Sequence, residues 1–330
     1  MLTKEKLIVY NWGEYMDPDV ITLFEEETGI DVVYEEYETN EIMYPKIQSG
    51  AIAYDVVCPS DYMIQRMIEN DLLAELNFDN IPNIKNIGST YMEHSKEFDP
   101  ENKYSVPHLW GTVGILYNKN VVSQEDLDKE GWNILCDEKY KGDLYMYDSE
   151  RDSFMIALKA LGYSMNTKNL DEIQQAYEWL IRQRDTMDPI YAGDDVIDNM
   201  ISGNKALAVV YSGDASYIIS ENPNLDYFTP EQGTNRWYDA MVITKDCSEV
   251  QLAHEFIDFM ISDKSALSNT EEVGYTSTVK SAFETMKEGD YAGISSYIPD
   301  TTNPNNEIFA YQQPKIKQKF AELWTKVKAK

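Results

Sequence analysis

Short apolar runs alternate with amphipathic segments along the first 110 residues of the chain. The runs KLIVYNW, IDVVYEEY and YDVVCPS predict strands, because β-branched and aromatic residues dominate them. Residues 17–29 predict a helix, with Asp17 as its cap, Pro18 at its first position and Gly29 past its end. Strands that alternate with helices of this size predict an α/β fold with a mostly parallel sheet covered on both faces.

Two more helices are expected in this first part of the chain. Residues 40–50 (NEIMYPKIQSG) predict a helix that Pro45 interrupts. Residues 60–71 (SDYMIQRMIEND) predict a helix with Ser60 at its N-cap.

A second alternating set of elements begins at residue 142. Strands are predicted at GDLYMYD, KALAVVYSG and RWYDAMVIT, and helices at SERDSFMIALKALGYS, LDEIQQAYEWLIRQRD, DNMISGN, SEVQLAHEFIDFMIS, DKSALSNTEEVG and QKFAELWTKVKAK. Only SYIPDTTNPNNE reads as a linker. Two such sets predict two α/β units, and a ligand crevice is expected between them or at the carboxyl ends of their strands.

The charge balance narrows the choice of partners. The chain has 330 residues, of which 58 are acidic and 28 basic, so its formal net charge is −30. This charge disfavours nucleic acids and anionic membrane surfaces and favours a cationic ligand. No apolar run is long enough to span a bilayer, and the start MLTKEKL lacks the apolar core of a signal peptide. We therefore expect either a cytosolic protein or an exported one whose signal segment is absent from this sequence.

The residues of the common catalytic centres are sparse. The three histidines and three cysteines show no metal-ligand or disulfide spacing, and no phosphate-binding glycine motif or nucleophile elbow occurs. We therefore expect no cofactor, no metal and no catalytic activity.

Aromatic residues instead stand beside carboxylates or polar residues, repeatedly, at the ends of predicted strands. The clusters are NWGEY (11–15), PSDY (59–62), YDSERDSF (147–154), VVYSGDAS (209–216) and RWYD (236–239). In a strand, Trp237 and Asp239 share one face, so both can project into one cavity. A carboxylate and an aromatic face together bind organic ammonium groups, the first by a charge-assisted hydrogen bond and the second by a cation–π contact.

Each cluster also has a purely structural interpretation. Trp12 and Tyr15 could be core aromatics at a strand end, and Ser60 and Asp61 could simply start a helix. The acids at 148 and 152 and Ser149 could serve only as the cap and first turn of the helix that follows. Several clusters of the same kind together favour the binding interpretation more strongly than any single cluster does.

The chain resembles a known family in order over essentially its whole length. The segments that carry this resemblance are YNWGEYMDPDVITLFEEETGIDVVYEEYETNEIMYPKI, YDVVCPSDYMIQRMIENDLL, FDPENKYSVPHLWGTVGILYN, YKGDLYMYDSERDSFMIALKALGYS, RWYDAMVIT and EEVGYTST. They look like the spermidine/putrescine-binding proteins of bacterial polyamine ABC transporters. The resemblance implies the type II periplasmic-binding-protein fold, with two α/β lobes that close over a polyamine ligand. It also implies an extracytoplasmic location, periplasmic or lipid-anchored, and a membrane permease as partner.

The resemblance also implies where the ligand binds. The aromatic box of the family falls on Trp12, Tyr15, Tyr62, Tyr211, Trp237 and Tyr275, and the ammonium-binding acids on Asp152 and Asp239, with Glu14 and Ser60 nearby. The implied first lobe comprises residues 1–110 and 238–285, and the second comprises 111–237 and 286–330.

Four positions depart from the family pattern. Tyr211 stands where Trp or Phe is usual, and Ser149 and Ala310 stand where some members carry polar or acidic residues. These changes leave the preference between spermidine and putrescine open. His108 replaces a common aromatic residue, and we assign it no ligand role.

We expect the polyamine-binding protein to be a monomer. Two alternative functions stay open beside this interpretation. The same fold could bind another organic cation, such as agmatine or a quaternary amine. A carbohydrate-active enzyme could also line a cleft with aromatic residues and work with two carboxylates, for instance Asp152 and Asp239.

Overall fold

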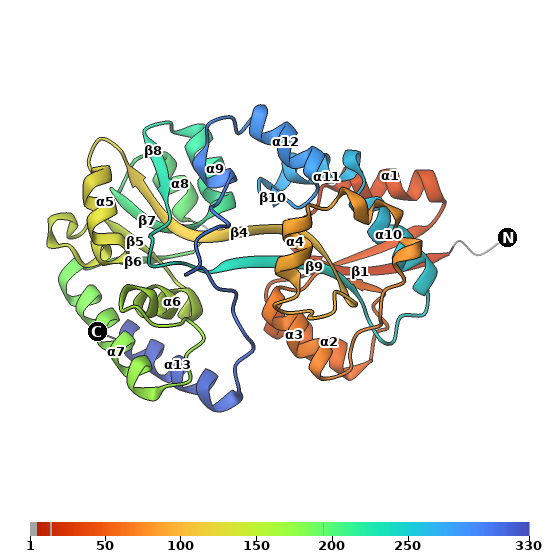
Figure 1. Cartoon of the computed structure of the whole chain (residues 1–330), viewed down its shortest axis with the longest axis horizontal. Helices are drawn as coiled ribbons and strands as arrows, with labels where there is room; N and C mark the ends of the chain where they lie inside the picture. The colour runs from red at the N-terminus through yellow and green to blue at the C-terminus, as the bar shows by residue number, and fades with distance from the viewer. Residues whose placement is uncertain (1–4, 14, 194, 330) are drawn as a thin grey trace. The chain divides into compact units, whose positions relative to one another are not determined.

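The computed structural model describes residues 5–13, 15–193 and 195–329 of the chain. The chain splits into two compact units: unit 1 comprises Met1–Trp110 and Trp237–Ala292, and unit 2 comprises Gly111–Arg236 and Gly293–Lys330 (Figure 1). It passes from one unit to the other within strand β4, within strand β9 and after residue 292.

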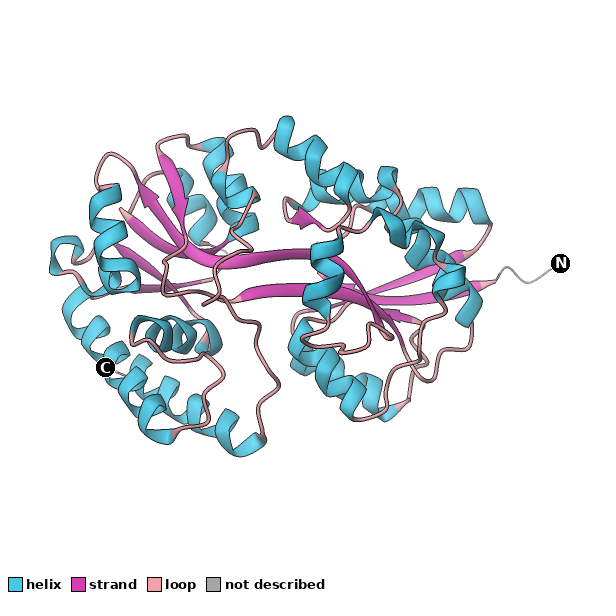
Figure 2. Cartoon of the chain, in the orientation of Figure 1, coloured by secondary structure: helices cyan, strands magenta, loops and turns pink. Residues whose placement is uncertain are grey.

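Unit 1 has strands flanked on two sides by helices (Figure 2). Its elements are β1 (Lys6–Trp12), α1 (Pro18–Thr28), β2 (Asp31–Tyr37), α2 (Asn40–Ser49), β3 (Val56–Val57), α3 (Asp61–Glu69), the 3-10 helices η1 (Phe78–Asn80) and η2 (Pro82–Asn86), α4 (Ser89–Ser95), the first part of β4 (Ser105–Asn118), β9 (Arg236–Ile243), α10 (Val250–Met260), α11 (Asp263–Val273), β10 (Thr276–Ser277) and α12 (Lys280–Glu288). β1 pairs in parallel with β2 and β3, whereas β3 pairs antiparallel with β9 and β10 antiparallel with β4.

Local chemistry explains the first helix of unit 1. Asp17 accepts a hydrogen bond from the Asp19 amide, Pro18 occupies the first position, and Gly29 ends α1 with a left-handed φ of 77°. Phe24 of this helix packs edge-to-face on Phe256 of α10 in the apolar core.

Unit 2 is built in the same manner around its own strands. Its elements are the second part of β4, α5 (Gln124–Glu130), η3 (Gly131–Cys136), η4 (Glu138–Tyr140), β5 (Leu144–Tyr147), α6 (Glu150–Ala160), α7 (Leu170–Met187), β6 (Ile190–Ala192), α8 (Val196–Ile201), β7 (Leu207–Tyr211), α9 (Ser212–Glu221), β8 (Leu225–Phe228), η5 (Ser295–Tyr297) and α13 (Pro314–Lys328). β5 pairs in parallel with β6 and β7, and β4 pairs antiparallel with β7 and β8. Helices α6, α7 and α13 pack together.

Two sequence expectations are corrected by this fold. The sheets are mixed, because β4 and β9 enter from distant parts of the chain and not through a strand–helix–strand crossover. Pro45 lies inside α2 without interrupting it, since burial of Met43, Tyr44 and Ile47 holds the helix on the core. Asp214 of the VVYSGDAS cluster lies in the first turn of α9.

Candidate functional site

The central residue of the candidate site in unit 1 is Asp239, on β9. Its side chain is buried, with the whole residue only 6% exposed, and it accepts hydrogen bonds from the Ser60 hydroxyl at 2.7 Å and the Tyr15 hydroxyl at 2.8 Å. Burial raises the pKa of this carboxyl to about 6, although both hydrogen bonds act to lower it. Among the residues that the structure describes, no lysine or arginine pairs with Asp239. Asp239 therefore has no cationic counter-ion among the described residues.

Ser60 reaches Asp239 because it does not cap its helix. It occupies the N-cap position of α3, but its side chain makes no capping hydrogen bond. Instead, Ser60 and Asp239 form an isolated antiparallel bridge, and the Asp61 carboxylate accepts the Tyr238 amide at 3.0 Å. The predicted N-cap position of Ser60 is thus confirmed, but its hydroxyl does not cap the helix, because β9 offers it a charged acceptor.

Three aromatic rings stand around this carboxylate in a chain of contacts. The Tyr275 ring lies 5.8 Å from the Tyr15 ring and 5.3 Å from the Trp237 ring, the latter in a T-shaped arrangement. Helix α11 positions both tyrosines: the Asp17 amide donates to Asn269 at 2.9 Å, and the Thr270 hydroxyl donates to the Tyr275 carbonyl at 2.5 Å. The structure thus brings Trp237, Asp239, Tyr15, Ser60 and Tyr275 into one cluster.

Trp12 and Tyr62 belong to neighbouring parts of unit 1. The Trp12 indole donates to the Cys58 carbonyl at 2.9 Å, and its ring contacts Tyr37 at 4.8 Å. The Tyr62 hydroxyl donates to the Glu41 carboxylate at 3.2 Å and accepts from the Asn40 amide at 2.9 Å. Glu14, the remaining candidate of this unit, lies outside the described residues.

Unit 2 contains a second pair of a carboxylate and a tyrosine. Asp152, in the first turn of α6, is 4% exposed and accepts a hydrogen bond from the Tyr211 hydroxyl at 2.7 Å. Burial, and then the charge of Asp152, raise the pKa of Tyr211 well above its usual value, so its hydroxyl stays protonated as a donor. Tyr147, at the end of β5, packs edge-on against Tyr211 with ring centroids 5.1 Å apart. The hydroxyl of Ser149 caps α6 by accepting the Asp152 amide.

Glu41, Tyr147 and His108 are neighbours of the candidate residues that sequence reasoning did not include. Glu41 stands at the start of α2 and Tyr147 at the end of β5, and each touches a candidate tyrosine. Tyr147 carries the signal that marked the others, an aromatic residue beside a carboxylate at a strand end.

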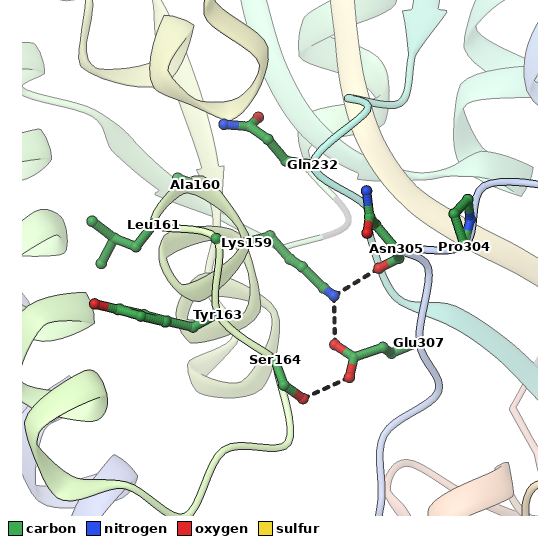
Figure 3. Close-up of a pocket in the computed structure, with 10 residues that line it drawn as sticks. Lys159, Ala160, Leu161, Tyr163, Ser164, Gln232, Pro304, Asn305 and Glu307 are labelled. Atoms are coloured by element: carbon green, nitrogen blue, oxygen red, sulfur yellow. Dashed lines mark hydrogen bonds and ion pairs between the residues drawn. The ribbon is translucent and has the colours of Figure 1, made fainter.

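A cavity of about 550 Å³ in unit 2 has a different character (Figure 3). Lys159, at its edge, donates to the Glu307 carboxylate at 2.5 Å and to the Asn305 carbonyl at 2.7 Å. Glu307 also accepts the Ser164 hydroxyl at 2.6 Å and the Met165 amide at 2.9 Å. These charged groups already satisfy one another, so this cavity lacks the unpaired carboxylate that an ammonium ligand needs.

Within residues 5–13, 15–193 and 195–329, no group of three or more His, Cys, Asp or Glu side chains could hold a metal ion. Over the same residues, no helix is long and apolar enough to cross a membrane. The chemistry that the site offers is recognition of an organic cation by buried carboxylates and aromatic rings.

Comparison with known proteins agrees with this chemistry. The family model of the bacterial extracellular solute-binding proteins matches residues 19–293. The spermidine/putrescine-binding periplasmic protein of Salmonella typhimurium is 31% identical over 297 residues, which cover 90% of this chain and 84% of that protein. Its counterpart in Escherichia coli is 29% identical over 324 residues, which cover 98% of this chain and 91% of that one.

The similarity extends to the fold, as comparison with a solved structure shows. The spermidine/putrescine ABC transporter substrate-binding protein PotD of Streptococcus pneumoniae superposes with a TM-score of 0.85 and 36% sequence identity. The match covers 98% of this chain and 99% of that one, so the two proteins share their whole two-lobed fold.

Proposed function

Because the chain belongs to the bacterial extracellular solute-binding proteins, we propose that it captures a linear polyamine and delivers it to the permease of an ABC transporter. The resemblance found in the sequence is confirmed by this family and its spermidine/putrescine-binding relatives. The observation that carries the proposal is Asp239, a buried carboxylate that two hydroxyl groups hold and that no described cation neutralises.

A protonated amine completes the coordination of Asp239. Its N–H groups donate to the carboxylate, and a charged hydrogen bond contributes roughly 1.5–3 kcal/mol before the costs of desolvation and ordering. The rings of Trp237, Tyr15 and Tyr275 attract the same cation and pack on its methylene groups, and each cation–π contact adds roughly 0.5–2 kcal/mol.

Asp152 and Tyr211 form the second amine-binding position of the proposal. They repeat the pairing of a buried carboxylate with a tyrosine hydroxyl, and Tyr147 adds an aromatic ring beside them. A linear polyamine carries at least two separated charges, which matches a protein with two such pairs. Trp12, Tyr62 and Glu14 complete the proposed aromatic and acidic lining.

The finer aspects of the function are part of the same proposal. The protein binds its ligand without chemical turnover, acts as a monomer outside the cytoplasm, and is either free in a periplasm or anchored by a lipid. It does not bind nucleic acid, since a net charge of −30 repels polyanions. The lobes proposed for ligand capture are residues 1–110 with 238–285 and residues 111–237 with 286–330.

A thermal-shift panel of putrescine, cadaverine, spermidine, spermine, agmatine and choline tests the proposal. A ligand that binds only the folded state raises Tm by an amount that grows with the logarithm of its concentration relative to Kd. We expect the linear polyamines to raise Tm most. A shift with choline or agmatine alone would instead support the alternative organic cation, and no shift with any amine would overturn the proposal.

A further inference from the structure

The three histidines of the chain differ in their hydrogen bonds. Buried His254 has a partner on each ring nitrogen: Nδ1 is 2.6 Å from the Val250 carbonyl, and Nε2 accepts the Asn77 amide at 2.9 Å. His94 places Nδ1 2.6 Å from the Tyr238 hydroxyl. His108 is only 4% exposed, and its Nε2 is a buried atom with no hydrogen-bond partner among the described residues.

An unpaired buried nitrogen is costly to the fold. Leaving such a group without a partner costs about as much as the lost hydration, and native structures pair the great majority of these atoms. His108 therefore conflicts with the usual rules of core composition, because a phenylalanine would fill the same space without an unpaired atom. Conflicts of this kind between local chemistry and fold are expected at functional positions.

The aromatic contacts of His108 in unit 1 show what its ring is near. Its ring meets the Tyr15 ring at an interplanar angle of 79°, with centroids 6.1 Å apart. The Tyr15 hydroxyl in turn donates to Asp239, and the Tyr15 ring contacts Tyr275. His108 is therefore one aromatic ring away from the carboxylate that carries the proposed function.

The charge state of His108 suits a cationic ligand. Burial lowers the pKa of its ring to about 4, so the imidazole is neutral at pH 7 and does not repel an ammonium group. A neutral imidazole has one N–H and one lone pair, and the lone pair can accept a hydrogen bond. A fully protonated polyamine offers only N–H donors, which matches that lone pair.

We propose that His108 is a ligand-contacting residue whose unpaired ring nitrogen accepts a hydrogen bond from an N–H group of the bound amine. The inference rests on the proposed function and departs from the expectation, drawn from the sequence, that His108 has no ligand role. It makes His108 a specificity determinant: amines with N–H groups gain a partner there, and quaternary ammonium compounds, which have none, do not.

Nuclear magnetic resonance of the imidazole nitrogens tests the inference directly, since the chain has only three histidines. Spectra of the full chain are compared before and after saturation with putrescine, and binding is followed independently by calorimetry. We expect the unprotonated nitrogen of His108 to move upfield on saturation, because it gains a donor, while the nitrogens of His254 stay unchanged. Binding of putrescine without a change at His108 would overturn the inference and leave the proposed function intact. Failure of every amine to bind would overturn both.

Two variants separate a hydrogen bond from a mere change of surroundings. His108→Phe keeps a ring against Tyr15 but removes the acceptor, and we expect it to weaken putrescine binding at least fivefold. His108→Gln restores an acceptor oxygen, so it should recover most of the affinity. Equal affinity of His108→Phe and the wild-type protein, with Tm preserved, would show that the ring only fills space.

Discussion

Two carboxylates of this protein, the buried Asp239 and the half-buried Glu307, differ in whether the fold supplies a cation. Asp239 in unit 1 accepts hydrogen bonds from the hydroxyl groups of Ser60 and Tyr15. Glu307 in unit 2 also accepts a serine hydroxyl, from Ser164, but it has in addition the ammonium group of Lys159 at 2.5 Å. The comparison separates a carboxylate that the fold itself neutralises from one that is left for a ligand.

The pKa values of the two groups express this difference. Burial raises the pKa of Asp239 to about 6, because its two hydroxyl donors do not offset the desolvation. Burial also raises the pKa of Glu307, but the hydrogen bonds from Lys159, Ser164 and Met165 outweigh it, and the net shift is downward. In unit 2 Lys159 thus does for Glu307 what a bound amine is proposed to do for Asp239.

The largest expected effect comes from removing the charge of Glu307. Glu307→Gln leaves the buried ammonium of Lys159 without its counter-ion, so it should lower the free energy of unfolding by about 3 kcal/mol, the lower end for a broken buried pair because Glu307 is partly exposed. Denaturant titration measures this loss, and polyamine affinity should not change. The matched control is Glu322→Gln, which removes the exposed pair with Lys326 and should cost less than about 0.5 kcal/mol. Equal losses for the two variants would show that Glu307 is not a structural ion pair.

Replacing Asp239 by its amide should have the opposite effect: a loss of polyamine affinity without a loss of stability. Asp239→Asn removes the counter-ion of the proposed amine, so we expect at least a tenfold loss of putrescine affinity by calorimetry, about 1.4 kcal/mol or more. Stability should not fall, because no described cation depends on Asp239 and an asparagine oxygen can still accept a hydroxyl. Asp290→Asn, at an exposed aspartate of the same unit, is the control and should change neither quantity. Unchanged affinity in Asp239→Asn would remove this residue from the site.

The two carboxylates also show what the sequence can and cannot predict. The position of Trp237 two residues before Asp239 on a predicted strand indicated that the two side chains share one face, and in the structure both neighbour Tyr15 or Tyr275. The tyrosine that bonds to Asp239 lies 224 residues away in sequence, and Lys159 lies 148 residues from Glu307. No local pattern records such pairings, so only the family resemblance placed Tyr15 beside Asp239, and nothing in the sequence paired Lys159 with Glu307.

Ser60 and His108 show a second limit. The cap position of Ser60 was visible in the sequence, but the choice of its hydroxyl between the helix amide and Asp239 depends on where β9 lies. The sequence showed only that His108 replaces a common aromatic residue, whereas its contact with Tyr15 and its unpaired nitrogen are properties of its packed surroundings. Local propensity thus predicted the elements, and the partners of individual polar atoms required the tertiary structure.

Asp239 and Glu307 also differ in how their contributions to the stability of the protein depend on pH. Since the folded pKa of Asp239 is raised above its ordinary 3.8, its contribution to stability is present at low pH and is lost as pH rises through about 6. The pKa of Glu307 is lowered from its ordinary 4.5, so its contribution is present above that value and is lost as pH falls below it. The two groups therefore shift the pH dependence of stability in opposite directions.

The pH dependence of polyamine affinity should reflect the protonation of Asp239 and not that of Glu307. A proton and an ammonium group compete for this carboxylate, so binding should be nearly constant above pH 7 and should weaken as pH falls through about 6. With that pKa, the fraction of ionised Asp239 in the empty site falls about tenfold between pH 7 and pH 5, and putrescine affinity should fall by a similar factor. Calorimetry at constant ionic strength measures the slope, which Glu307→Gln should retain and Asp239→Asn should flatten. An equal slope in Asp239→Asn and the wild-type protein would mean that another group takes the proton, and the unpaired carboxylate would then lose its proposed role.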